Sequence, residues 1–147
     1  MAALADEKTD VHRKGLDGRY VKVILKTTKT FYPGAMCSYD TSGDVVPSTD
    51  AASEIFAGIY DGATLTTTAD TDGQLLIGQK EWIRQDGNIT AAMTGKVAVV
   101  LNDQTLTNAI TATNDVKVGQ ILELESFGGN AGCWIVTGKT DGLVVAP

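Results

Sequence analysis

The chain has 147 residues, of which 43% are hydrophobic and 20% are charged, and its formal net charge is −6. A domain of this size can bury about 70% of the surface of its unfolded chain, so the composition predicts a packed core and excludes wholesale disorder. The negative charge repels phosphates and acidic headgroups, so we expect no nucleic-acid partner and no membrane partner.

The first 18 residues, MAALADEKTDVHRKGLDG, are polar and charged, without a sustained hydrophobic period or a secretory signal pattern. We predict a flexible N-terminal arm over residues 1–18 and a β-barrel or sandwich domain over residues 19–147. The arm is either an ordinary loose terminus or a segment that orders on a partner. In the second case its contacts would come from apolar anchors and basic neighbours, namely Val11, His12, Arg13, Lys14, Leu16, Arg19 and Tyr20.

Strand signals begin at Tyr20. Residues 20–27 and 30–39 combine alternation with β-branched and aromatic residues, and turns rich in glycine, proline and aspartate follow them. Residues 50–56 could form one helical turn capped by Asp50. Residues 74–84 have the pattern of one strand, and Gly78 inside it indicates a bulge or a close backbone approach.

The second half of the chain has the same character. Residues 95–101, 116–125, 133–137 and 143–145 have strand patterns, whereas residues 102–115 predict a long loop that could hold a short helix near 106–110. About eight to ten short strands with turns every 8–12 residues predict an all-β fold. We expect a small β-barrel or sandwich with at most one or two short helical turns.

The sequence offers little for catalysis. Its one histidine, His12, falls in the predicted arm, where it could not be held rigidly beside a serine or cysteine nucleophile. Residues 70–81 have acidic residues at calcium-loop spacing, but Leu75 replaces the required glycine. We therefore predict that the chain is not an enzyme, and we expect no cofactor and no bound metal.

Three other features have simple structural interpretations. The glycine-rich residues 127–132 precede a strand, so a hairpin turn is favoured over a phosphate loop. Trp82 and Trp134 are expected to pack in the core, the alternative being a platform for carbohydrate stacking. Cys37 and Cys133 are expected to be buried free thiols, with a single long-range disulfide as the minority alternative.

A family resemblance covers roughly residues 29–146. The stretch YPGAMCSYDTSGDVVPSTDAASEIFAGIYDG resembles the small capsid decoration, or cement, proteins of tailed bacteriophages, as do the later segments GQKEWIRQDGNI, GKVAVVLND and NDVKVGQILELESFGGNAGCWIVTGKTDG. The shared features are a polar N-terminal arm, a hairpin punctuated by glycine and proline, and the VKVGQ entry to a paired strand. These are turn patterns, and no catalytic residue is carried over.

The resemblance implies a structural virion protein on the capsid exterior, made in the host cytoplasm and assembled as a homotrimer. Such a protein stabilises the expanded icosahedral head by bridging subunits of the major capsid protein. Its contacts would include Tyr32, Met36, Tyr39 and Val45, unless these side chains fill the domain's own core. The alternative function is a carbohydrate- or protein-binding β-module of a phage tail or fibre.

Overall fold

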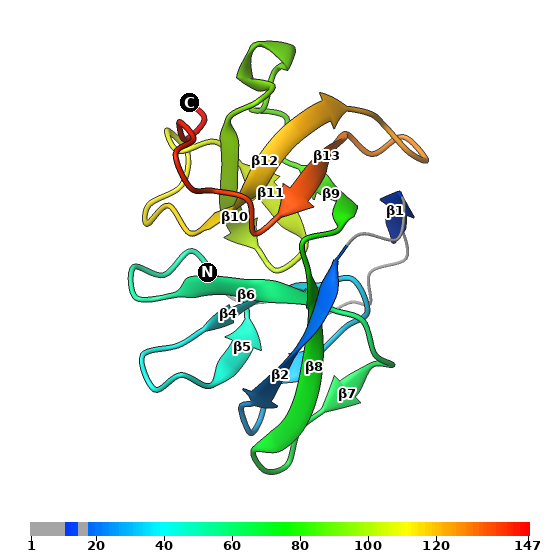
Figure 1. The fold of residues 1–147 in the computed structure, drawn as a ribbon, viewed down its shortest axis with the longest axis vertical. Helices are drawn as coiled ribbons and strands as arrows, with labels where there is room; N and C mark the ends of the chain where they lie inside the picture. The colour runs from blue at the N-terminus through cyan, green and yellow to red at the C-terminus, as the bar shows by residue number, and fades with distance from the viewer. Residues whose placement is uncertain (1–10, 15–17) are drawn as a thin grey trace.

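Thirteen β-strands and one 3-10 turn, η1 (Ala91–Met93), make up the regular structure of the computed structural model, which describes residues 11–14 and 18–147. The predicted all-β fold is confirmed. The strand count exceeds the expected eight to ten because several strands have only two or three residues. The strands form two closed barrels that are stacked along the long axis of the molecule (Figure 1).

The lower barrel in Figure 1 has the strand order β2-β5-β4-β6-β8. Its strands are β2 (Arg19–Leu25), β4 (Met36–Tyr39), β5 (Val45–Pro47), β6 (Ile55–Tyr60) and β8 (Thr71–Ile77). β2 pairs antiparallel with β8 along its whole length, but it pairs with β5 at one position. A separate two-stranded sheet consists of β3 (Thr30–Phe31) and β7 (Leu65–Thr66).

The upper barrel has the order β9-β11-β10-β12-β13, and pairing between β9 and β13 closes it. Its strands are β9 (Lys80–Gln85), β10 (Val97–Asn102), β11 (Thr105–Thr107), β12 (Lys117–Leu124) and β13 (Gly132–Thr137). Strand β1 (His12–Lys14) adds to β9 outside this ring. β9 therefore pairs with β1 and β11 along one edge and with β13 along the other.

The chain passes from one barrel to the other at Gly78. This glycine has φ of 92°, a conformation that favours glycine, and its N–H donates to the Thr137 carbonyl at 3.0 Å. The expected single strand over residues 74–84 is therefore two strands, β8 and β9, which lie in different barrels. On either side of this crossing a strand from the N-terminal part of the chain pairs antiparallel with it, β1 with β9 and β2 with β8.

The two barrels share buried surface. Met36 of β4 and Ile59 of β6 belong to the lower barrel, yet both are fully buried in the hydrophobic cluster that fills the upper barrel. The Met36 N–H also donates to the Asp103 carbonyl at 2.7 Å. Burial of each large aliphatic side chain contributes roughly 1.5–3 kcal/mol, so the barrels stabilise each other.

Both expected helical segments are wrong. Asp50 does not cap a helix, because its carboxylate accepts the N–H groups of Thr113 and Asn114 at 2.7 and 2.8 Å, and β6 begins at Ile55. In the second segment, Leu106 pairs with β9 and β10 as part of β11. In the first segment the expected capping carboxylate binds a distant loop, and in the second the backbone pairs with distant strands.

Candidate interaction surface

Part of the predicted arm is an ordered strand. β1 pairs antiparallel with β9, with His12 opposite Trp82 and Lys14 opposite Lys80. The prediction of a flexible arm is therefore wrong for residues 12–14, because β9 offers an edge that satisfies their backbone groups. Residues 1–10 and 15–17, including the predicted contact Leu16, lie outside the described residues.

Arg13 joins the two barrels through two carboxylates. Its Nε donates to Glu81 Oε1 of β9 at 2.5 Å, and a terminal nitrogen donates to Asp61 Oδ1, just after β6, at 2.7 Å. Tyr20 donates its hydroxyl to the other Asp61 oxygen at 2.9 Å, and the Gln79 amide donates to Glu81 at 3.1 Å. We call these five side chains the Arg13 network.

Glu81 makes this network energetically important. Its side chain has no exposed surface, and a buried carboxylate is costly unless charge and hydrogen bonds compensate it. Burial by itself lowers the pKa of Arg13, but Glu81 and Asp61 outweigh that effect, so the pKa is raised. The hydrogen bond to Asp61, together with its charge, raises the pKa of Tyr20. Arg13 therefore stays charged.

Aromatic rings surround the other two residues of β1. The His12 ring stacks on Phe127 with centroids 4.0 Å apart, and it meets the edge of Trp82 at 5.4 Å. Lys14 Nζ lies 4.3 Å from the centre of the Trp134 ring and 2.8 Å from Glu123 Oε1. Each side chain of β1 thus has a specific partner.

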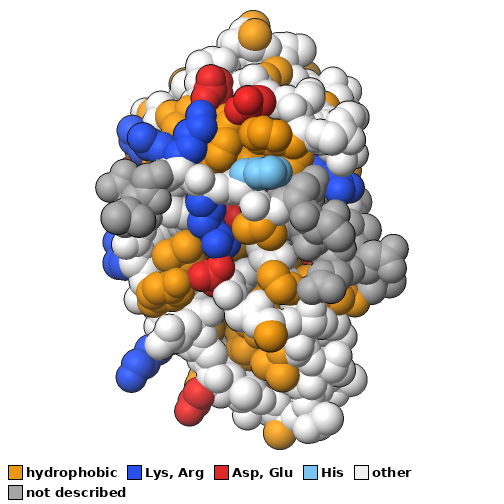
Figure 2. All heavy atoms as spheres, turned by 90° about the vertical axis from the view of Figure 1, so that its right-hand side faces the viewer, with side chains coloured by type: hydrophobic (Ala, Val, Ile, Leu, Met, Phe, Trp, Pro, Cys, Tyr) orange, Lys and Arg blue, Asp and Glu red, His pale blue; other side chains and the backbone are white. Residues whose placement is uncertain are grey.

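Figure 2 shows this face of the molecule, with the single histidine lying against hydrophobic side chains and with basic and acidic side chains nearby. Trp82 is fully buried and Trp134 is 4% exposed, so the predicted core packing of both is confirmed. Their indole N–H groups donate to the carbonyl and the carboxylate of Glu125 at 2.8 and 2.7 Å. Neither ring face is open for a sugar to stack on, which removes the observation that favoured a carbohydrate-binding module.

The remaining predicted contact residues are scattered. Arg19 is exposed and Tyr20 is 59% exposed at the start of β2, close to β1 in sequence. Tyr32 and Tyr39 are half-buried. Met36 has no exposed surface, so its assignment as a surface contact is wrong and the alternative, that it fills the core, is correct.

Val11 is half-buried, directly before β1. Val45, like Met36, is fully buried, and it packs in the core of the lower barrel. The structure therefore places Val11, His12, Arg13 and Lys14 in or next to β1 and Tyr20 at the start of β2, on either side of the crossing between the barrels.

The cysteines are buried free thiols, as predicted. Cys37 lies in the cluster of the lower barrel and Cys133 in that of the upper barrel, so they are not placed to pair. Burial raises the pKa of Cys133 to about 12 and raises that of Cys37 as well. Both thiols are therefore protonated and unreactive at neutral pH.

The calcium-like spacing does not form a site. Asp70 accepts the Thr27 N–H at 2.9 Å, while Glu81 lies in the other barrel and binds Arg13. In residues 11–14 and 18–147, no three or more His, Cys, Asp or Glu side chains are grouped so that they could hold a metal ion. No helix in the described part of the chain is long and apolar enough to cross a membrane.

No protein-family model, curated protein or solved structure matches this chain.

Proposed function

We propose that this chain is a capsid decoration protein. It binds the outer surface of the expanded icosahedral head of a tailed bacteriophage and stabilises the head by bridging subunits of the major capsid protein. The observation that carries the proposal is the resemblance of residues 29–146 to decoration proteins, which extends over strands β3 to β13 and the turns between them.

The architecture is suited to such a role. Two closed barrels with a shared core form a stiff body, and closure hides most strand edges from unwanted pairing. A ligand that binds the expanded lattice and not its precursor stabilises that lattice by mass action. No reaction at the decoration protein is needed, so we also propose that the chain is not an enzyme.

The Arg13 network supports the proposal by fixing the N-terminal part of the chain. Because Arg13 binds both Glu81 and Asp61, β1 has a defined position across the junction of the barrels. The exposed side chains of Arg19 and Tyr20 lie directly after it. We propose that this region contacts the capsid or a neighbouring protomer of a homotrimer, in which three weak contacts add up through avidity.

The test is binding to purified expanded heads that lack the protein. We expect the full chain to saturate the heads and to raise their temperature of rupture, measured by release of DNA. Electron microscopy of these heads should show added density on the outer surface. Absence of saturable binding to heads, or equal binding to unexpanded precursors, would contradict the proposal.

Two truncations separate contact from folding. Removal of residues 1–18 deletes β1 and with it Arg13, so we expect a less stable protein and weaker binding to heads. Removal of residues 1–10 keeps β1 and serves as the matched control for stability. If removal of residues 1–10 is enough to weaken binding to heads, those residues supply capsid contacts. If binding weakens only when residues 11–18 are removed as well, the β1 region supplies them.

A further inference from the structure

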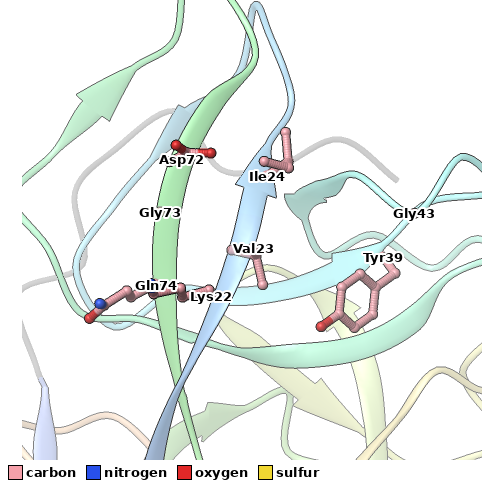
Figure 3. A pocket seen from close by; sticks show the side chains of 8 residues that line it. All are labelled: Lys22, Val23, Ile24, Tyr39, Gly43, Asp72, Gly73 and Gln74. Atoms are coloured by element: carbon pink, nitrogen blue, oxygen red, sulfur yellow. The ribbon is translucent and has the colours of Figure 1, made fainter.

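Within residues 11–14 and 18–147, no strand pairs with one edge of β2 along most of its length. The opposite edge pairs with β8 from Arg19 to Leu25. On the open side, the pairing with β5 consists of Leu25 opposite Val45, together with the Lys26 N–H, which donates to the Val45 carbonyl at 2.9 Å. β2 and β5 diverge from this point. An open pocket of about 530 Å³ lies between β2, β8 and the β4–β5 hairpin (Figures 1 and 3).

Strand alternation identifies the backbone groups on this edge. Because the Lys26 N–H faces β5, the N–H and C=O groups of Lys22 and Tyr20, which lie an even number of positions before it, face the same side. Those of Val21 and Val23 face β8. Among the described residues, pairing with β5 reaches only the end of β2, so Lys22 presents a main-chain donor and acceptor to the pocket.

The side chains beside this edge define what could pair with it. On the outer face, Tyr20 is 59% exposed, Ile24 is 41% exposed, and Lys22 lies between them, also exposed. Val23 and Tyr39 line the pocket from its two sides (Figure 3). A strand added beside β2 would place its outward side chains next to Tyr20, Lys22 and Ile24, which are apolar, cationic and apolar in that order. The best complement has an acidic residue with apolar residues two positions before and after it.

We propose that the open edge of β2 is a docking site for an extended segment of a partner protein, and that this segment carries an acidic residue between apolar ones. Main-chain hydrogen bonds supply the affinity, while Tyr20, Lys22 and Ile24 select the outward side chains. The inference goes beyond the proposed decoration function, because it holds whether or not the partner is a capsid subunit.

Charge complementarity favours such a partner over a second copy of this edge. If two copies paired antiparallel about Lys22, the two lysines would lie opposite each other, and like charges in that arrangement destabilise a sheet. An acidic residue at the centre of the added segment meets Lys22 with the opposite charge. An ion pair between Lys26 and Asp40 at 2.7 Å links the ends of β2 and β4 next to the position where β2 pairs with β5.

The test uses the full chain, labelled with nitrogen-15, and an acetylated, amidated peptide of sequence TITETIT. We expect saturable shifts of amide signals around Lys22, Val23, Tyr39 and Gly43. The matched peptide TITKTIT should bind up to about fivefold more weakly, as expected for one cross-strand charge pair. Lys22→Glu should reverse the preference between the two peptides.

Two substitutions at one position separate main-chain pairing from charge. Lys22→Pro removes the N–H that faces the pocket but none that pairs with β8, so binding should be lost while the rest of the spectrum is retained. Lys22→Thr keeps that N–H and should keep most of the binding. If the proline variant does not fold, the reversal of preference in Lys22→Glu remains the deciding measurement.

Three results would overturn the inference. The first is the absence of saturable shifts, or shifts confined to another surface. The second is peptide binding that appears only after residues 1–10 are removed, which would make the chain's own N-terminus the occupant. The third is concentration-dependent self-association that Lys22→Pro abolishes, which would make a second copy the occupant.

Discussion

Replacing Arg13 with alanine tests how strongly β1 holds the two barrels together. The substitution removes the ion pair from the fully buried carboxylate of Glu81, which still accepts a hydrogen bond from the Gln79 amide. Breaking a buried ion pair costs about 3–5 kcal/mol. The Arg13 side chain is 26% exposed, so water can reach part of the site. We therefore expect the free energy of unfolding to fall by an amount near the lower end of this range, about 3 kcal/mol.

Urea unfolding followed by tryptophan fluorescence measures this loss, because Trp82 pairs with β1 and Trp134 lies beneath Lys14. For a chain of this size, about 3 kcal/mol corresponds to a decrease in melting temperature of roughly 6–12 °C. Arg19→Ala is the matched control. Arg19 is exposed on β2, so its replacement should change the free energy of unfolding by less than about 0.5 kcal/mol.

A second variant identifies the cause of the loss. Arg13→Ala with Glu81→Gln also removes the buried charge of Glu81, so we expect the double variant to recover part of the stability lost in Arg13→Ala. The reasoning is refuted if Arg13→Ala is as stable as Arg19→Ala, or if adding Glu81→Gln destabilises the protein further.

Three more predictions follow from the described packing and charges. Gly119→Ala should unfold the protein or cost at least about 3 kcal/mol in thermal or urea unfolding, because the new Cβ would lie within 2.1 Å of a β13 carbonyl oxygen. Cys37 and Cys133 should not react with a thiol reagent at pH 8 in the folded protein, and both should react in urea, as counted by absorbance. The hydrogen bond from Lys26 lowers the pKa of Asp40, so its contribution to stability is present above about pH 4 and is lost as the pH falls further. Asp40→Asn should therefore reduce the free energy of unfolding at pH 7, and this effect should shrink as the pH falls below about 4, as measured by urea titration.

The part of the site that could be read from the sequence is the basic cluster around His12. It stands out because the rest of the chain is acidic, and three of its members, His12, Arg13 and Lys14, do lie together in β1. Their partners could not be read in the same way. Glu81 is 68 positions from Arg13, and a glutamate beside Lys80 has the appearance of an ordinary solvated charge. One signal was present: Glu81 directly precedes the buried pair Trp82 and Ile83.

The open edge of β2 could not be predicted from the sequence either. The sequence predicts a strand near residues 20–27, but strand periodicity describes which way side chains point and not which edge has a neighbour. The single pairing of Leu25 with Val45 depends on where the β4–β5 hairpin lies after the barrel closes. Edges are a property of the sheet, so only the folded chain reveals them.

Local pattern by itself determined the class of this protein. β-branched residues, glycines and frequent turns favour short strands over helices wherever they occur, so the all-β fold follows from the sequence. The number of barrels, the change of barrel at Gly78, and the place of His12–Lys14 on β9 were decided by tertiary structure. These features depend on hydrogen bonds and ion pairs between residues far apart in the chain, and local preference carries no information about such partners.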